Sequence, residues 1–401
     1  MSSNFSIARL PRIAFGAGTI NKLPMLVHNY GTHALLITGA RSLKDAGVWP
    51  GIESGLASAG IGWQSEAVSG EPSPQQVDEI ARRYRQQGIQ VVVGIGGGSV
   101  LDTAKAIAGL LKVEDSVMDY LEGVGPEKPY QGPSVPFIAV PTTAGTGSEA
   151  TKNAVLSVAG KDGFKKSFRD EQLVPEYALI DPDLLASCPR QLIAADGMDA
   201  LTQLLESYVS IKANPMTDSL AWGGMEAARD SLLPWYEGGG DQQQARSGMA
   251  YAALSSGICL AQTGLGSVHG LASPLGAFFP IPHGVVCGTL VGAATRVNID
   301  AMLAREVDNP ALDKYARVAE LLCGRSFPTQ EQAWEELLAL LDDWTQRLQL
   351  PTLDHYGISH TDFRHIVANS RGSSMQTNPI VLTDEEIETV LAQRCQAWDI
   401  L

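Results

Sequence analysis

The chain has 401 residues, of which 44% are hydrophobic and 18% charged, and its formal net charge is −15. This length exceeds the usual size of one hydrophobic core and predicts two domains. The acidic balance argues against non-specific nucleic-acid binding, because no surplus of lysine and arginine is present to neutralise phosphates. The five scattered cysteines, with no C-x-x-C pair, indicate a reducing compartment and argue against a disulfide framework or a thiolate zinc site.

The sequence also shows neither the apolar core of a signal peptide nor a run long enough to cross a membrane. We therefore expect a cytoplasmic protein without a membrane partner.

Up to residue 190, short apolar runs alternate with helical segments. Helices are expected over residues 49–59 and 99–111, and strands over "HALLITG" (33–39), "IQVVVGI" (89–95), "VPFIAVPTT" (135–143) and "YALIDPDLL" (177–185). Such alternation is typical of an α/β domain with a mainly parallel sheet. We assign residues 1–190 to this domain.

Beyond residue 190 the pattern changes to long helical periodicity. The clearest helices are expected over residues 217–236, 245–262 and 331–348, and the glycine-rich stretch 237–248 between the first two is expected to be a loop. We assign residues 191–401 to an all-helical second domain.

The segment "VVVGIGGGSVLDTAKAIAG" joins an apolar strand to a helix through Gly96, Gly97 and Gly98. Glycines allow close approach of a ligand, and the free N–H groups of a helix start favour an anion such as pyrophosphate. Ser99 and Asp102 have the spacing of a capping box. The alternative is a tight turn that binds nothing.

A second loop, "VPTTAGTGSEATKN", follows another apolar strand and places the hydroxyls of Thr142, Thr143, Thr146 and Ser148 around two glycines. Such a loop suits sugar hydroxyls, phosphates or a ring amide. The alternative is a polar loop that satisfies its own backbone.

The helical stretch "GMDALTQLLE" places Asp199 and Gln203 four residues apart on one helix face. His269 and His283 lie in the apolar, glycine- and proline-rich "GLGSVHGLASPLGAFFPIPHGVVCG". If these segments converge, the two histidines and Asp199 would form a carboxylate and two-imidazole set suited to Fe²⁺ or Zn²⁺. The alternative is that the histidines are packed core residues. His355, His360 and His365 are spaced by fives in polar surroundings, and we expect them at the surface.

Together these segments make the chain resemble the iron-containing (group III) alcohol dehydrogenases nearly end to end. "IAFGAG", "GIGGGSVLDTAKAIA", "PTTAGTGSEAT", "DALTQ", "HGLASPLGAFFPIPHG" and "NPIVLTDEEIETVL" each match a segment of that family. The resemblance implies the dehydroquinate synthase-like fold, an NAD(P)(H)-dependent alcohol oxidoreductase, a divalent metal and a homodimer.

The resemblance also assigns residues to roles. Asp199, Gln203, His269 and His283 fall on the metal ligands, and Ser273 joins the two histidines and Asp199 among the catalytic positions. The cofactor positions are Gly39, Arg41, Ser42, Gly97, Gly98, Ser99, Asp102, Thr142, Thr143, Thr146, Asn153, Lys165 and Leu179.

Two residues depart from the family pattern, in which histidine usually stands at the position of Gln203 and commonly at that of Ser273. The amide oxygen of Gln203 can bind a metal but is a weaker donor than imidazole, so we expect a looser site. Serine does not titrate near neutral pH, so we expect the proton relay to run through water or the cofactor ribose.

The segment "LLITGARS" bears on the choice between NAD and NADP. Many NAD enzymes have, at the position of Gly39, an acidic residue that hydrogen-bonds the ribose, and here Arg41 follows instead as a nearby cation. This favours acceptance of NADP(H); the alternative is that Arg41 simply faces solvent. The alternatives to an alcohol dehydrogenase are a catalytically degenerate nucleotide-binding homologue, a polyol oxidoreductase similar to glycerol dehydrogenase, and a lyase similar to dehydroquinate synthase.

Overall fold

The structure is a computed structural model that describes residues 4–40, 43 and 47–395. The chain forms two compact units. One comprises Ser6–Val158 and Lys165–Pro189, and the other continues from Arg190 and also includes Ala159–Phe164.

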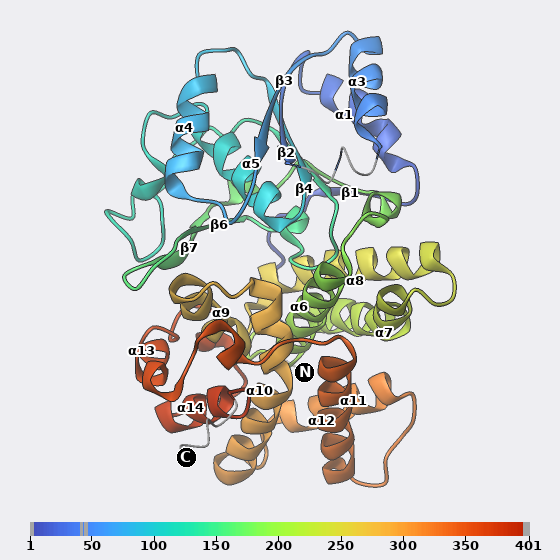
Figure 1. Cartoon of the computed structure of the whole chain (residues 1–401), viewed down its shortest axis with the longest axis vertical. Helices are drawn as coiled ribbons and strands as arrows, with labels where there is room; N and C mark the ends of the chain where they lie inside the picture. The colour runs from blue at the N-terminus through green and yellow to red at the C-terminus, as the bar shows by residue number, and fades with distance from the viewer. Residues whose placement is uncertain (1–3, 41–42, 44–46, 396–401) are drawn as a thin grey trace. The chain divides into compact units, whose positions relative to one another are not determined.

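The first unit is built on a six-stranded parallel sheet with the strand order β1-β8-β5-β4-β2-β3 (Figure 1). The expected α/β fold with a parallel sheet is therefore confirmed. The strands of this sheet are β1 (Arg12–Phe15), β2 (His33–Gly39), β3 (Gly62–Val68), β4 (Val91–Gly96), β5 (Phe137–Pro141) and β8 (Tyr177–Ile180).

The central strands are apolar because both faces of a parallel sheet are covered. Every residue of β4 and β5 is buried. The helices of this unit are α1 (Leu23–His28), α3 (Trp49–Ser58), α4 (Pro74–Tyr84) and α5 (Gly98–Leu110), and α5 packs against β4. A separate two-stranded sheet pairs β6 (Asn153–Val158) with β7 (Phe164–Arg169).

The strand order reverses at β2, which pairs with β3 on one side and with β4 on the other. In open α/β sheets, ligands bind beyond the carboxyl ends of the strands at such a reversal. The turns that follow β2 and β4 begin at Gly39 and Gly96, so the glycine turn lies at the expected end of the sheet.

The second unit is helical, and no strand occurs among the described residues from 190 to 395. Its helices are α6 (Arg190–Val209), α7 (Pro215–Glu237), α8 (Gln242–Thr263), α9 (Ser267–Phe278), α10 (His283–Arg305), α11 (Pro310–Cys323), α12 (Gln330–Arg347), α13 (Phe363–Ala368) and α14 (Asp384–Ala392). No described helix combines the length and apolar character needed to cross a bilayer.

The loop expected over residues 237–248 is much shorter in the structure. Helix α7 ends at Glu237, and its C-cap Gly238 adopts the left-handed conformation that glycine favours (φ 76°). The side chain of Asp241 then caps α8 by accepting hydrogen bonds from the N–H groups of Gln243 and Gln244. The polar residues after Asp241 are therefore the first turn of a helix, and only residues 238–241 connect the two helices.

Candidate metal centre and cofactor-binding loops

Helix α6 supplies three buried polar side chains to one face. Asp199, Gln203 and Glu206 are 0%, 3% and 6% exposed, in a helix whose other buried positions are mostly apolar. Their spacing of four and three residues places them one above another. Buried carboxylates are costly unless they are paired or bind a cation, so this face marks a site.

Two histidines from other helices meet Asp199. The Nε2 atom of His269, in α9, lies 3.1 Å from Asp199 Oδ1, and Nε2 of His283, the first residue of α10, lies 3.8 Å from the same oxygen. The structure thus brings together three residues that span 85 positions of the sequence from 199 to 283.

Glu206 holds the second nitrogen of His269. The Nδ1 atom lies 2.6 Å from Glu206 Oε2, while Oε1 accepts a hydrogen bond of 2.7 Å from the N–H group of Val268. A carboxylate that accepts from Nδ1 fixes the imidazole so that Nε2 faces the site. Glu206 was not among the predicted site residues, although it follows Gln203 by three residues and therefore shares a helix face with Gln203 and Asp199.

Cys287 also belongs to this cluster. It lies one helical turn after His283, is completely buried, and its Sγ atom is 3.4 Å from His269 Nε2 and 3.8 Å from His283 Nε2. The donor atoms of Asp199, His269, His283 and Cys287 all lie within 4.8 Å of one another. The cysteine spacing argued against a thiolate zinc site, and the structure places the Cys287 thiol among the candidate donors, one helical turn from His283.

The carboxylate of Asp199 fits a cation. Burial acts to raise its pKa, but the charge of His283 and the hydrogen bond from His269 hold that pKa below its usual range, so the group is ionised. Its Oδ2 atom is buried and has no hydrogen-bond partner among the described residues. An ionised, buried and unpartnered oxygen beside two imidazoles is suited to a divalent metal.

Gln203 does not direct its amide oxygen into the donor cluster. Its Nε2 donates to Asp199 Oδ1 at 3.1 Å, and its Oε1 accepts from the hydroxyl of Ser256 at 2.7 Å. Metal binding by this oxygen stays a prediction, and it would require the amide to turn away from Ser256. In the arrangement seen, an ionised Asp199 attracts the amide N–H group rather than the carbonyl.

Ser273 lies on α9 one helical turn after His269 and is partly buried. The other histidine group is placed as expected, because His355, His360 and His365 are all exposed.

In the first unit, the glycine turn and the threonine loop pack closely against each other. A Cβ atom on Gly98 would lie 2.6 Å from Thr146 Oγ1, and one on Gly97 would lie 3.3 Å from Thr143 Cγ2. Thr142 donates its N–H to the carbonyl of Gly96 at 3.0 Å. Glycine is required here because a side chain would displace the threonines.

The expected capping box at Ser99 and Asp102 is wrong. Helix α5 begins at Gly98 with Gly97 as its N-cap, and no side chain caps it. The Asp102 carboxylate instead accepts from the hydroxyl of Ser148 and, at 3.0 Å, from the N–H of Val155. The first N–H groups of α5 therefore stay free of a side-chain cap, which suits an anionic ligand.

Lys105 holds the threonine loop in place through hydrogen bonds. It is completely buried, and its Nζ atom donates to the carbonyls of Ser148 (2.8 Å) and Asn153 (2.7 Å) and to Thr151 Oγ1 (3.0 Å). Burial lowers the pKa of Lys105 to about 8. Its distance from Asp102 Oδ1 is 3.7 Å.

The other cofactor positions are dispersed. Lys165, in β7, pairs with Glu71 at 2.9 Å, and Asn153 opens β6. Leu179, in β8, is completely buried, so its side chain offers no surface to a ligand. Gly39 ends β2, whereas Arg41 and Ser42 lie outside the described residues.

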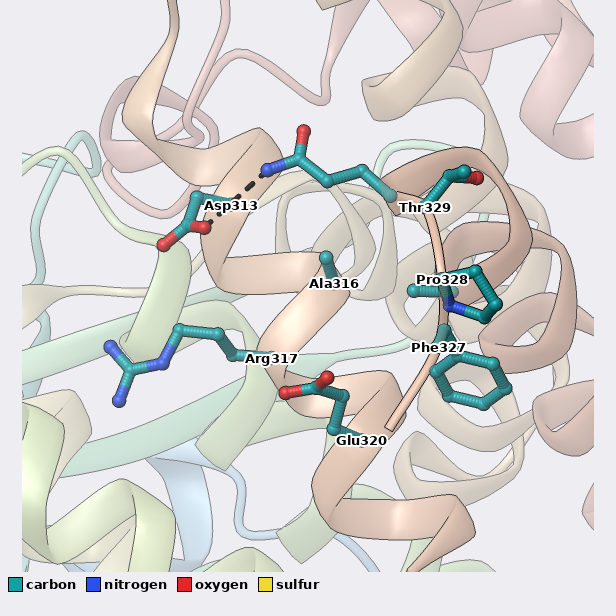
Figure 2. A pocket seen from close by; sticks show the side chains of 9 residues that line it. Asp313, Ala316, Arg317, Glu320, Phe327, Pro328 and Thr329 are labelled. Carbon is teal, nitrogen blue, oxygen red and sulfur yellow. Dashed lines mark hydrogen bonds between the residues drawn. The ribbon is translucent and has the colours of Figure 1, made fainter. Parts of the chain in front are cut away.

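A cavity of about 200 Å³ lies elsewhere in the helical unit, between α11 and the segment that leads into α12 (Figure 2). Its lining includes Arg317, Glu320 and Phe327, and Gln330 Nε2 donates to Asp313 Oδ1 at 3.4 Å across its rim. The volume is below the usual range of ligand pockets, and none of the site residues lines it.

Comparison with known proteins gives a consistent result. The family described as iron-containing alcohol dehydrogenase matches residues 11–182, and the one described as Fe-containing alcohol dehydrogenase family, C-terminal, matches residues 193–395. The NAD-dependent methanol dehydrogenase of Bacillus methanolicus is 29% identical and the match covers 97% of this chain and 99% of that protein.

Two further relatives support the same grouping. The NADPH-dependent butanol dehydrogenase of Clostridium saccharobutylicum is 30% identical, with 89% of this chain and 88% of that protein covered. The crystal structure of 1,3-propanediol oxidoreductase superimposes with a TM-score of 0.86 at 29% identity, covering 98% of this chain and 100% of that one.

Proposed function

Because the chain belongs to the iron-containing alcohol dehydrogenase family, we propose that Asp199, His269 and His283 hold the divalent metal of an alcohol oxidoreductase. The enzyme interconverts an alcohol and its aldehyde or ketone, with NAD(P)(H) as the hydride carrier. The observation that supports this assignment most directly is the convergence of two imidazoles on a buried carboxylate whose Oδ2 atom lacks a partner among the described residues.

The residues present fit Fe²⁺ or Zn²⁺, which bind carboxylate and imidazole. Such an ion would supply Lewis-acid polarisation of the substrate oxygen. The protein groups have separate tasks: Asp199 contributes negative charge, and Glu206 orients His269 through Nδ1. Ser273 lies one helical turn from His269, and we propose that its hydroxyl lies beside the proton path but is not itself a group that gains or loses the proton.

For the cofactor, we propose that the N-terminal turn of α5 binds the pyrophosphate and that the threonine loop binds the nicotinamide end. The start of α5, which no side chain caps, and the close packing of Gly98 on Thr146 support this. The absence of an acid at Gly39 supports acceptance of NADP(H). Relatives named as NAD-dependent and NADPH-dependent both occur.

The relatives named above act on methanol, butanol and propanediol, so short aliphatic alcohols and aldehydes form the first substrate panel. The test follows the nicotinamide absorbance of the protein reconstituted with Fe²⁺ or Zn²⁺, with aldehyde and NADPH or NADH. Steady oxidation of the cofactor supports the proposal. Binding of cofactor without turnover across the panel would favour the degenerate homologue instead.

The variant Asp199→Asn tests the site, because it keeps the shape and removes the charge. Metal content and turnover should both fall, whereas cofactor binding should be retained. The family resemblance also leads us to propose a cytoplasmic homodimer. Sedimentation of the purified protein would test whether it is a dimer.

A further inference from the structure

We infer that Cys287 is a metal ligand, so that this chain binds its metal through a carboxylate, two imidazoles and a thiolate. The inference rests on the proposed metal site and specifies its fourth donor. The family pattern usually has histidine at position 203, and the structure places a sulfur atom from another helix beside the remaining donors.

The spacing of the donor atoms fits one ion. At usual bond lengths and tetrahedral angles, neighbouring nitrogen, oxygen and sulfur donors lie about 3.3 to 3.6 Å apart. A substrate oxygen would bind as a fifth ligand, an expansion that catalytic zinc sites allow. In the structure, Cys287 Sγ lies 3.4 Å from His269 Nε2 and 3.8 Å from His283 Nε2. Two of the separations that involve Asp199 Oδ1 are 3.1 Å and 3.8 Å. These four separations depart from the expected range by at most about 0.2 Å, and all the donor atoms lie within 4.8 Å of one another.

The packing of α10 explains why the sulfur reaches this position. Gly284 and Gly288 lie before and after Cys287 on α10, and both face α6. A Cβ atom on Gly284 would lie 2.6 Å from the carbonyl oxygen of Ala195, and one on Gly288 would lie 2.7 Å from the Cβ of Met198. The two helices therefore approach more closely than larger residues would allow, which brings Cys287 against the carboxylate of Asp199.

Charge also favours sulfur over the amide of Gln203. The sulfur binds as the thiolate, and its proton is released to solvent when the metal enters. Thiolate and carboxylate together cancel the charge of a divalent ion inside a buried cluster. The Gln203 oxygen is neutral and already accepts a hydrogen bond from Ser256. Because thiolate is a soft donor, the set suits Zn²⁺ particularly well.

X-ray absorption of the zinc-loaded protein tests the inference without relying on activity. One sulfur neighbour at about 2.3 Å, in addition to nitrogen and oxygen at about 2.0 Å, is expected. The cobalt-substituted protein should show a thiolate-to-metal charge-transfer band in the near ultraviolet. Cys287→Ser should abolish both signals and weaken zinc binding about tenfold or more.

The matched control is Cys259→Ser, because Cys259 is also completely buried in the helical unit but its Sγ contacts the carbonyl of Thr217. It should retain the sulfur neighbour and the cobalt band. A second variant, Gln203→His with Cys287→Ser, restores the donor types usual in the family. It should bind zinc with no sulfur neighbour, which separates lost ligation from lost folding.

The possible results are distinguishable. A zinc shell of nitrogen and oxygen alone in the unmodified protein overturns the thiolate ligand while leaving the proposed oxidoreductase intact. Failure of the unmodified protein to bind any divalent metal overturns the proposed metal site and the thiolate with it.

Discussion

His269 Nδ1 lies 2.6 Å from Glu206 Oε2, and this contact joins α9 to α6 directly beneath the proposed metal donors. Glu206 also accepts from the N–H of Val268 and therefore holds the first turn of α9, whose N-cap Gly266 has no side chain to do so. A Cβ atom on Gly266 would lie 2.8 Å from Glu206 Oε1. One carboxylate thus sets both the position of the helix and the orientation of its histidine.

The first prediction concerns this contact. Glu206→Gln keeps the side-chain shape but removes the charge that holds the Nδ1 proton, so the imidazole loses its preferred orientation. We expect the affinity for zinc to fall by about 10- to 100-fold. Competition with a chromogenic chelator measures it, and the exposed Glu335→Gln serves as the control. Equal affinities for both variants would contradict a positioning role for Glu206.

The second prediction concerns Ser273. If the proton leaves through water or the cofactor ribose, Ser273→Ala should change kcat by less than about twofold, because the hydroxyl does not titrate near neutral pH. Ser273→His should add a group that does titrate there, and the pH profile of kcat should gain an inflection. A collapse of kcat in the alanine variant would show that the hydroxyl itself passes the proton.

The third prediction concerns cofactor choice at the end of β2. Gly39 lies in extended backbone, a conformation that aspartate adopts readily. Gly39→Asp places a carboxylate where it binds ribose hydroxyls and repels a 2′-phosphate. We expect the ratio of kcat/KM for NADPH to that for NADH to fall by about tenfold or more. A ratio that already strongly favours NADH in the unmodified enzyme would contradict the proposed acceptance of NADP(H).

The fourth prediction concerns pH and Glu149, in the threonine loop. Burial raises the pKa of this carboxyl from 4.5 to about 7. Between these values the folded state binds more protons than the unfolded state, so the contribution of Glu149 to stability falls as the pH rises through this window. The difference of 2.5 pH units corresponds to about 3 kcal/mol as an upper bound.

Glu149→Gln replaces the carboxyl by a neutral group of the same shape. Its apparent Tm should match that of the unmodified protein near pH 5 and exceed it at pH 8, where the unmodified protein holds a buried carboxylate. Thermal unfolding at the two pH values measures this. A variant that is less stable at pH 8 would mean that the carboxylate has a stabilising partner.

Local sequence determined the elements. The short run "VVVGIG" indicates a buried strand because it is rich in β-branched residues and ends in glycine, and the long Ala- and Leu-rich segments indicate helices by their length and composition. The parallel sheet followed from their alternation, and the glycine turn followed from the strand-to-helix junction. Asp199, His269 and His283 could be predicted as site residues because burying an ionisable group in apolar surroundings costs free energy unless the group is paired or binds a ligand.

Tertiary structure decided which atoms meet. The spacing of His283 and Cys287 places them on one face of α10, but only the close packing of α10 on α6 at Gly284 and Gly288 turns that face toward Asp199. The orientation of the Gln203 amide likewise depends on Ser256, 53 residues away in the sequence. Periodicity sets local conformation because it acts over one or two helical turns, whereas donor contacts depend on packing between helices that are far apart along the chain.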